Sequence, residues 1–250
     1  MFDLSAEVVI VTGASSGLGR HFAQKLSAAG AAVALLARRR DKLDDLVGAL
    51  PAGRALAIAA DIVDPTSINS VIASVTAALG QPTILINNAG VADDHAAIDL
   101  DDDDWQRVLD TNLTAAWQMA QLCAKSWVAA KRPGNIINIA SILGLRVAGR
   151  SLPYAVSKAG LIHMTKALSL EWARHQIRVN AIAPGYIETD INRDFFATPS
   201  GEMLIKRIPQ RRLGQPSDLD GVLLLLASSA SSYITGSVIA VDGGHLNSSL

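Results

Sequence analysis

The chain has 250 residues, of which 50% are hydrophobic, and it carries 22 basic and 23 acidic side chains. This balance gives no general attraction to nucleic acid or to an anionic membrane surface, so neither is an expected partner. Aliphatic runs such as Val222 to Ala227 are too short to cross a bilayer.

Cysteine and histidine give no sign of a disulfide or a metal centre. Cys123 is the only cysteine, and the five histidines are scattered without ligand spacing to one another. Residues 1–4 lead directly into a strand-like run, which leaves no room for a signal peptide. The cytoplasm is therefore the expected compartment.

Short β-rich runs alternate with longer helical patterns along the chain. The runs that predict strands are 8–11, 32–36, 55–59, 84–86, 136–139, 177–182 and 238–241. The helical patterns cover 19–29, 43–50, 68–79, 105–130, 153–174 and 219–228. This alternation predicts parallel strands with right-handed crossovers, hence an α/β fold of the Rossmann type: one doubly wound parallel sheet with helices on both faces. No linker-like segment or repeat divides it, so residues 1–250 are expected to form a single domain.

The first predicted strand runs straight into a glycine-rich turn that opens a helix. Residues 12–19 read Thr-Gly-Ala-Ser-Ser-Gly-Leu-Gly. Glycines let the backbone approach a phosphate, and free N–H groups at a helix N-terminus bind the anion. A dinucleotide is the expected ligand, and its candidate contacts here are Gly13, Ser15, Ser16, Gly17, Leu18 and Gly19.

The end of the second strand favours NADP(H) over NAD(H). Ala37 occupies the usual place of an acid that binds the adenosine ribose, and Arg38, Arg39 and Arg40 follow it. Guanidinium groups suit a 2′-phosphate, so Arg38 and Arg39 are candidate cofactor contacts. The alternative is that these arginines form a solvated start of a helix, and NAD(H) remains possible.

The third and fourth strand ends add further candidate cofactor contacts. Asp61, with Ile62 beside it, could accept from the adenine amino group, or it could cap the turn at Asp64. The fourth strand leads into Asn-Asn-Ala-Gly at 87–90, where amides can tie strand ends together and small residues leave room for a cofactor. Asn88, Ala89 and Gly90 are the candidates there.

Tyr154 and Lys158 are four residues apart, so they share one face of the predicted helix. We expect the lysine charge to lower the pKa of the phenol and make it a proton donor near neutral pH. This spacing alone is common in surface helices. Ser141, at the end of the fifth strand, and Asn112, a polar residue inside a helical pattern, add weight because together they form a candidate site.

These motifs, with Pro184-Gly185 and Val241-Asp-Gly-Gly244, resemble the short-chain dehydrogenase/reductase family in its compact single-domain form. The resemblance covers Val8 to Gly244 and includes 3-oxoacyl-acyl-carrier-protein reductases and small ketone or alcohol dehydrogenases. It implies a dinucleotide-binding catalytic domain, a homotetramer, and a catalytic set of Asn112, Ser141, Tyr154 and Lys158.

The resemblance also implies a reaction. Hydride passes between nicotinamide and the carbon of a ketone or secondary alcohol while Tyr154 acts as general acid or base. Lys158 and Tyr154 also contact the cofactor, Ser141 donates to the substrate oxygen, and Asn112 positions a water. The remaining cofactor contacts implied are Pro184, Gly185, Ile187 and Thr189.

The substrate side is less determined by the sequence. A lid is expected at about 190–212, and a mostly apolar pocket is expected from eight residues: Ile142, Leu143, Val147, Leu152, Tyr186, Phe195, Phe196 and Met203. Arg146 and Arg150 could meet a phosphate or carboxylate, but we expect them to face water. A free ketone, a secondary alcohol and a 3-oxoacyl thioester all stay open as substrates.

A function of a different class is a non-catalytic protein that senses the NADP(H) ratio and regulates a partner. The complete Asn, Ser, Tyr and Lys set favours the enzyme, because a sensor has no need of a proton donor.

Overall fold

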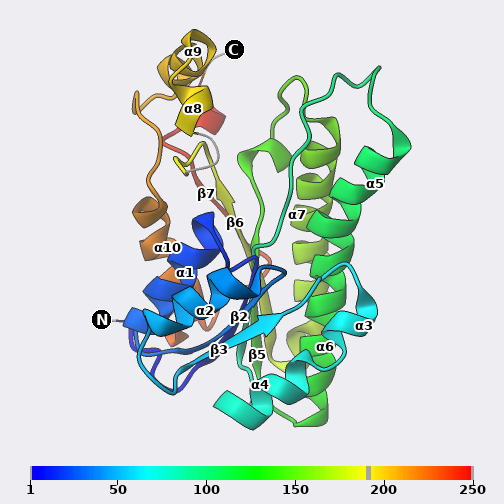
Figure 1. Ribbon diagram of the computed structural model, residues 1–250, viewed down its shortest axis with the longest axis vertical. Coiled ribbons are helices and arrows are strands. Elements are labelled where there is room, and N and C mark those ends of the chain that lie inside the picture. The colour runs from blue at the N-terminus through cyan, green and yellow to red at the C-terminus, as the bar shows by residue number, and fades with distance from the viewer. Residues whose placement is uncertain (1, 190–192, 249–250) are drawn as a thin grey trace.

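The computed structural model describes residues 2–189 and 193–248, and its centre is one parallel sheet (Figure 1). Its seven strands lie in the order β3-β2-β1-β4-β5-β6-β7. Their bounds are β1 Val8–Thr12, β2 Ala32–Ala37, β3 Ala55–Ala59, β4 Ile84–Asn87, β5 Gly134–Ile139, β6 Ile177–Pro184 and β7 Val238–Val241. Every predicted strand is thus present, and the predicted doubly wound α/β sheet is confirmed.

The order of strands reverses direction between β1 and β4. The chain runs outward from β1 through β2 to β3, then returns to place β4 on the other side of β1. Registers such as Val11 opposite Ile86 and Asn87 opposite Asn138 bring the carboxyl ends of the central strands together. A crevice forms outside the strand ends at such a reversal, and this is where sheets of this kind bind ligands.

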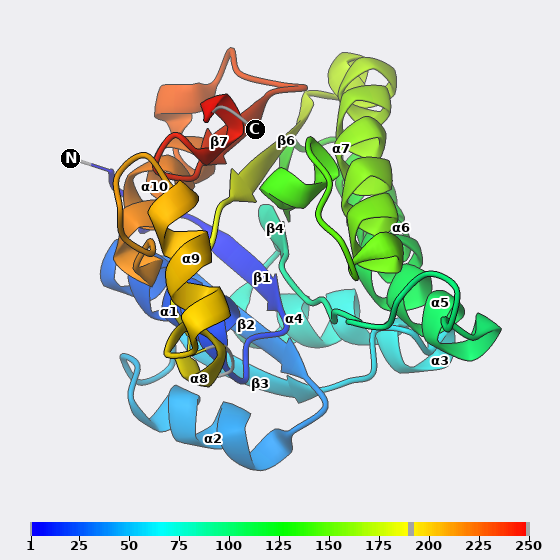
Figure 2. The same ribbon diagram turned by 90° about the horizontal axis from the view of Figure 1, so that it is seen from above.

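Helices cover both faces of the sheet (Figure 2). They are α1 Gly17–Ala28, α2 Arg40–Gly48, α3 Pro65–Ile68, α4 Val71–Leu79, α5 Asp102–Leu109, α6 Ala115–Ala129, α7 Leu152–Trp172, α8 Arg193–Phe196, α9 Pro199–Arg207 and α10 Asp220–Ala227. Buried side chains of α1, α2 and α10 pack on one face, and those of α4, α6 and α7 pack on the other. Within the described residues, no helix combines the length and apolar character that crossing a membrane requires.

Three helix predictions need correction. The pattern at 68–79 is two helices, α3 and α4, and α3 begins at a side-chain cap, where Asp64 accepts from the backbone N–H of Thr66. The pattern at 105–130 is interrupted by a π-helical segment, Asp110–Thr114, between α5 and α6. The segment between Gly185 and the predicted helix at 219–228, where the sequence predicts no helix, contains α8 and α9 beyond residue 192.

A buried polar chain fixes α7 against the sheet. Asn87 Nδ2 donates to Asn138 Oδ1 at 3.0 Å, and Asn138 Nδ2 donates to Thr165 Oγ1 at 2.8 Å. Although Asn87 Oδ1 has no hydrogen-bond partner among the described residues, these two bonds join side chains of β4, β5 and α7. The helix that carries Tyr154 and Lys158 is therefore positioned relative to the strand ends.

Candidate active site

The glycine turn between β1 and α1 is shaped by two close backbone approaches. A Cβ on Gly13, which has φ +67°, would lie 2.8 Å from Ala89 Cα, and one on Gly19 would lie 2.3 Å from Gly13 O. Gly17, with φ +51°, instead faces open space. Gly13 and Gly19 are required for packing, whereas Gly17 leaves room for a phosphate at the start of α1.

Thr12 joins the glycine turn to the end of β4. Its Oγ1 accepts from the backbone N–H groups of Asn88 and Ala89 at 3.0 and 3.1 Å. Asn88 Nδ2 returns a hydrogen bond to Thr12 O at 2.9 Å. The expected tying of strand ends by asparagine amides is confirmed. The Thr12 hydroxyl adds two further hydrogen bonds between these strand ends, which its place in the motif alone does not predict.

The three arginines after β2 have different surroundings. Arg39 donates to Ser15 Oγ at 2.9 Å and to Ser16 Oγ at 2.8 Å, so it connects the end of β2 to the glycine turn. Arg40 pairs with Asp44 one helical turn later. Arg38 is exposed, and within the described residues it makes no hydrogen bond or ion pair. A solvated role thus fits Arg40, while Arg38 and Arg39 border the glycine turn.

Asp61 caps the turn that leads to Asp64. Its Oδ1 accepts from the backbone N–H of Val63 at 3.1 Å, and its backbone O accepts from the N–H of Asp64 at 3.2 Å. The capping alternative for Asp61 is therefore confirmed, and Asp64 in turn caps α3.

These strand ends enclose a cleft of about 640 Å³. Of the residues predicted to contact a cofactor, those lining it are Gly13, Ser15, Ser16, Gly17, Leu18, Gly19, Arg38, Arg39, Asp61, Ile62, Asn88, Ala89, Gly90 and Thr189. Pro184, Gly185 and Ile187 lie at and beyond the end of β6 and do not line it. Arg107, Asp110 and Thr111, which sequence reasoning did not select, also line the cleft. Phosphate-sized open space at Gly17 and polar groups along the walls fit a dinucleotide.

Lys158 lies on the same face of α7 as Tyr154, as the spacing predicts. Its Nζ is 5.6 Å from the centre of the Tyr154 ring and donates to Ile139 O at 2.8 Å. The side chain is buried, and burial lowers the pKa of this ammonium from 10.5 to about 8. A Cβ on Gly90 would lie 3.5 Å from this Nζ, which places the ammonium directly behind the cofactor cleft.

The pKa of Tyr154 differs from the expectation. Burial of the phenol raises its pKa above the ordinary 10.0; the Ser141 hydroxyl opposes this by hydrogen bonding, and Tyr186 adds to the rise. The expected net lowering of this pKa is wrong in this structure, because burial of the phenol outweighs the groups that favour the phenolate. Ser141, at 8% exposure, is the neighbour that favours the phenolate.

Asn112 is fully buried inside the π-helical segment. Its Oδ1 accepts from Val91 N at 2.8 Å, and its Nδ2 donates to Val91 O at 2.9 Å and to Ser157 Oγ at 3.0 Å. The amide therefore fastens the loop after β4 to α7, next to Lys158. These hydrogen bonds explain why a polar residue occupies this position in a helical pattern, and the residue lies in a π-helical turn, which is wider than an α-helical one.

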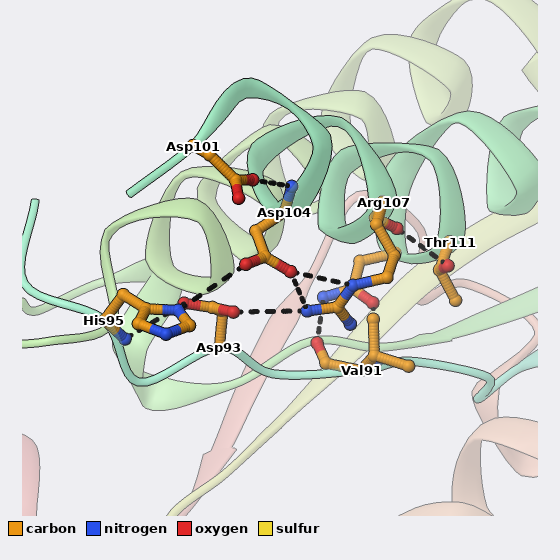
Figure 3. A network of polar contacts seen from close by, with 8 residues as sticks. Val91, Asp93, His95, Asp101, Asp104, Arg107 and Thr111 are labelled. Atoms are coloured by element: carbon orange, nitrogen blue, oxygen red, sulfur yellow. Dashed lines mark hydrogen bonds and ion pairs between the residues drawn. The ribbon is translucent and has the colours of Figure 1, made fainter. Parts of the chain in front are cut away.

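The same loop is held to α5 by a charged network (Figure 3). Arg107 donates to Asp93 Oδ2 at 3.1 Å and to Asp104 Oδ1 at 2.9 Å, and His95 Nδ1 lies 3.0 Å from Asp93 Oδ1. Potential ligand atoms of Asp93, His95 and Asp104 lie within 4.8 Å of one another. Because the Arg107 guanidinium already pairs with both carboxylates, this group serves as an ion-pair clamp on the wall of the cofactor cleft.

A second pocket, of about 950 Å³, begins at the residues that follow Ser141. Of the eight residues predicted for a substrate pocket, Ile142, Leu143, Val147 and Tyr186 line it. Leu152, Phe195 and Met203 do not line it and are 42%, 50% and 59% exposed. Phe196 is buried, with its ring centre 6.0 Å from that of Tyr186.

The expectation of a mostly apolar pocket is wrong. Lys206, Arg207, Arg211 and His245 also line it, together with Arg146. Arg146 is half-buried and donates to His245 O at 2.8 Å, so the expectation that it faces water is wrong as well. Arg150 is exposed, as expected. The sequence did not reveal these cations as a group because they come from segments distant along the chain.

Comparisons with known proteins agree with this arrangement. The model of a family described as enoyl-(acyl carrier protein) reductase matches residues 13–245. The 2-dehydro-3-deoxy-D-gluconate 5-dehydrogenase of Escherichia coli K12 is 39% identical, covering 98% of this chain and 97% of its own. The 3-oxoacyl-[acyl-carrier-protein] reductase of the same strain is 35% identical, with coverages of 97% and 98%.

A solved structure is similarly close in fold. It is the crystal structure of a gluconate 5-dehydrogenase from Burkholderia cenocepacia J2315 in complex with NADP and tartrate. The two chains superpose with a TM-score of 0.93 at 31% identity, and the match covers 99% of this chain and 98% of the other.

The cofactor-sized cleft beside half-buried Tyr154 and buried Ser141 and Lys158 defines a nucleotide-dependent oxidoreductase. The chain belongs to the short-chain dehydrogenase/reductase family. It is an NAD(P)(H)-dependent enzyme that acts on CH–OH and C=O groups of small molecules.

Proposed function

We propose that the protein is an NADP(H)-preferring ketone reductase or secondary-alcohol dehydrogenase in which Tyr154 is the general acid and base. The observation that carries this proposal is the position of Tyr154. Tyr154 lies between the cofactor cleft and the second pocket, next to one residue at each. Lys158 lies behind the cofactor cleft, and Ser141 begins the segment that lines the second pocket.

The chain's own residues supply the proton chemistry. When bound, the nicotinamide cofactor supplies or accepts the hydride. In reduction, Tyr154 gives its phenolic proton to the substrate oxygen, and the Ser141 hydroxyl donates a hydrogen bond to the same oxygen as negative charge develops there. Lys158 remains mostly protonated at neutral pH with a pKa of about 8, so its ammonium can stabilise the phenolate and help to reprotonate it from solvent.

Asn112 acts as a positioning residue in this scheme. Its side chain is used in hydrogen bonds to Val91 and Ser157, so it holds the loop beside Gly90 and Lys158 in place. A water positioned at the π-helical segment would connect Lys158 with solvent, as the family resemblance implies.

Preference for NADP(H) rests on the arginines at the end of β2. Arg38 and Arg39 line the cleft, and Arg39 is already held against Ser15 and Ser16. In the absence of an acid at Ala37, these guanidinium groups suit a 2′-phosphate. The related gluconate 5-dehydrogenase structure contains NADP, which supports this choice; NAD(H) is the alternative cofactor.

Further features are proposed on the family resemblance. The enzyme forms a homotetramer in the cytoplasm, and the whole chain is a single catalytic domain. Residues at about 190–212 serve as a lid over the second pocket, to which Leu204, Lys206, Arg207 and Arg211 contribute; positions 190–192 of this segment lie outside the described residues. Pro184, Gly185, Ile187 and Thr189 hold the carboxamide end of the cofactor.

The decisive experiment replaces Tyr154 with Phe. We expect Tyr154→Phe to lower kcat by about a thousandfold or more, because the proton donor is lost, and to leave NADPH affinity within about threefold. Turnover of ketones and alcohols is followed at the nicotinamide absorbance, and cofactor binding by fluorescence. Near-normal activity would contradict the mechanism.

A non-catalytic sensor of the NADP(H) ratio is the alternative. Tight cofactor binding without turnover of any panel substrate would support it. A 3-oxoacyl thioester is a second substrate candidate, supported by the similarity to the acyl-carrier-protein reductase. Including such a thioester in the panel tests it directly.

A further inference from the structure

We propose that the second pocket binds a substrate carrying a carboxylate, a small hydroxy or keto acid, and that Arg146 is the residue that receives that carboxylate. This inference rests on the proposed function, because it names the substrate class of the same site.

The pocket adjoins the catalytic group, because Ile142 and Leu143, which line it, directly follow Ser141. The backbone N–H of Arg146 donates to Ile142 O at 2.8 Å, within a tight turn that starts at Ser141. Tyr186, on the opposite side, lines the pocket and lies close enough to Tyr154 to affect its pKa. A molecule that places its carbonyl between Ser141 and Tyr154 therefore extends toward Arg146.

The electrostatic character of the pocket is one-sided. Its lining includes the cations Arg146, Lys206, Arg207 and Arg211, and among the described residues no Asp or Glu lines it. Lys206, Arg207 and Arg211 have no acidic partner in the part of the chain that the structure covers. The whole chain has a net charge of −1, so this concentration of positive charge is local and attracts an anion.

Arg146 is the cation best prepared for direct contact. It is half-buried, and its Nη1 is held by His245 O at 2.8 Å and Ser248 Oγ at 3.3 Å. These two bonds use one nitrogen and fix the plane of the guanidinium, so its other nitrogens keep donors for a carboxylate. A fixed guanidinium loses less entropy on binding than a free one.

His245 supplies a second, independent sign of a ligand. The residue is 8% exposed and lines the pocket, yet its Nδ1 has no hydrogen-bond partner among the described residues. Burial lowers the imidazole pKa, and Arg146 and Arg207 lower it further while Asp242 opposes them. Asp242 is itself used by the backbone N–H groups of Gly244 and Leu246. The pocket is thus lined by a largely neutral imidazole whose buried Nδ1 keeps an unused hydrogen-bonding position.

The position of Arg146 favours a small acid over an acidic carrier protein. Lys206, Arg207 and Arg211 are exposed, so their charges could bind either a small acid or an acidic carrier protein. Arg146 is half-buried, lines the pocket and is held beside Ile142, which suits contact with a small molecule inside the pocket. The occupant of the pocket is therefore assigned as a small carboxylic acid.

The test compares paired substrates that differ only in charge. D-gluconate and D-glucitol share one polyol skeleton and differ by carboxylate against CH₂OH. Oxidation of both by the full-length enzyme with NADP is measured for the wild type and for Arg146→Gln, Arg146→Lys, Arg207→Gln and the matched exposed control Arg150→Gln. We expect the wild type to favour the acid by at least about tenfold in kcat/KM.

The variants identify the residue responsible. Arg146→Gln should lower kcat/KM for gluconate by about 10- to 100-fold and change glucitol by less than about threefold, because only the acid loses a charged hydrogen bond. Arg146→Lys should recover part of the loss, and Arg150→Gln should change neither. Arg207→Gln leaves the turn at His245 untouched, so a loss confined to the acid in this variant supports binding of the acid in this pocket even if Arg146→Gln folds poorly; Arg146→Lys then tests the role of Arg146 itself.

The outcomes separate this inference from the proposed function. Turnover of neutral ketones or alcohols without any preference for acids overturns the inference and leaves the proposed function standing. If no substrate turns over, calorimetric binding of tartrate to the NADP complex decides: binding that Arg146→Gln abolishes supports the inference, and no binding to the wild type overturns it. If the cations matter only for reduction of an acyl-carrier-protein thioester, they dock a carrier protein and the inference is wrong.

Discussion

The cofactor cleft takes most of its lining from the turns that follow β1 to β4, whereas the second pocket is lined by residues near 142–149, 186, 204–211 and 245–248. The cleft is shaped largely by backbone, through close approaches at Gly13 and Gly19. The pocket depends on side chains whose charges come together only in the fold. Backbone-built sites tolerate little change, and pockets lined by long side chains can be altered residue by residue.

Glycines from the two regions test this difference most strongly. We expect Gly19→Ala to lower the free energy of unfolding by about 3 kcal/mol or more and to abolish cofactor binding, since its Cβ would meet Gly13 O at 2.3 Å. Alanine otherwise stabilises a helix by about 1 kcal/mol relative to glycine, so a destabilising effect of Gly19→Ala would show that the steric contact outweighs helix propensity. Gly149 lines the second pocket, and a Cβ added there would have no atom within 4 Å. Gly149→Ala should therefore change the free energy of unfolding by less than about 0.5 kcal/mol.

Urea denaturation and NADPH titration of both variants measure the effect. If Gly19→Ala binds cofactor normally, the view of the cleft as a backbone-built site is wrong.

Lys158, which lies behind the cofactor cleft, should make the free energy of unfolding depend on pH. Its pKa of about 8 in the folded chain lies below 10.5, so between these values the unfolded chain binds more protons and stability rises with pH. From pH 7 to 9.5 this contribution is about 2 kcal/mol. The isosteric Lys158→Met removes it. Unfolding by urea at the two pH values checks the prediction, which fails if both proteins show the same change.

Arg38 should give the smallest effect, because it is exposed and solvent screens its charge. We expect Arg38→Gln to weaken NADPH relative to NADH by about tenfold, since one guanidinium is lost from the 2′-phosphate. Arg40→Gln is the matched control, because Arg40 pairs with Asp44 on the surface of α2. The ratio of kcat/KM for the two cofactors is the measurement. An unchanged ratio in Arg38→Gln would leave the preference for NADP(H) without support from this residue.

Features that depend on neighbouring residues can be predicted from the sequence, whereas features that depend on residues far apart along the chain cannot. Strands were predicted well because β1, β4 and β5 are buried on both faces and read as continuous apolar runs. The π-helical segment around Asn112 was missed, since its hydrogen bonds to Val91 and Ser157 come from other parts of the chain. The pKa of Tyr154 was given the wrong direction because spacing shows a nearby lysine and does not show burial.

The sequence by itself determined the order of elements, the glycine turn, and the placing of Tyr154 and Lys158 on one helix face, because each follows from local backbone geometry or from periodicity. Only the tertiary structure decided which charged side chains line the second pocket. Arg146 meets His245 across 99 positions of the chain, and Arg207 joins them from α9. Such meetings depend on how the whole sheet folds, since charge and burial at a site are summed over neighbours in space rather than neighbours in sequence.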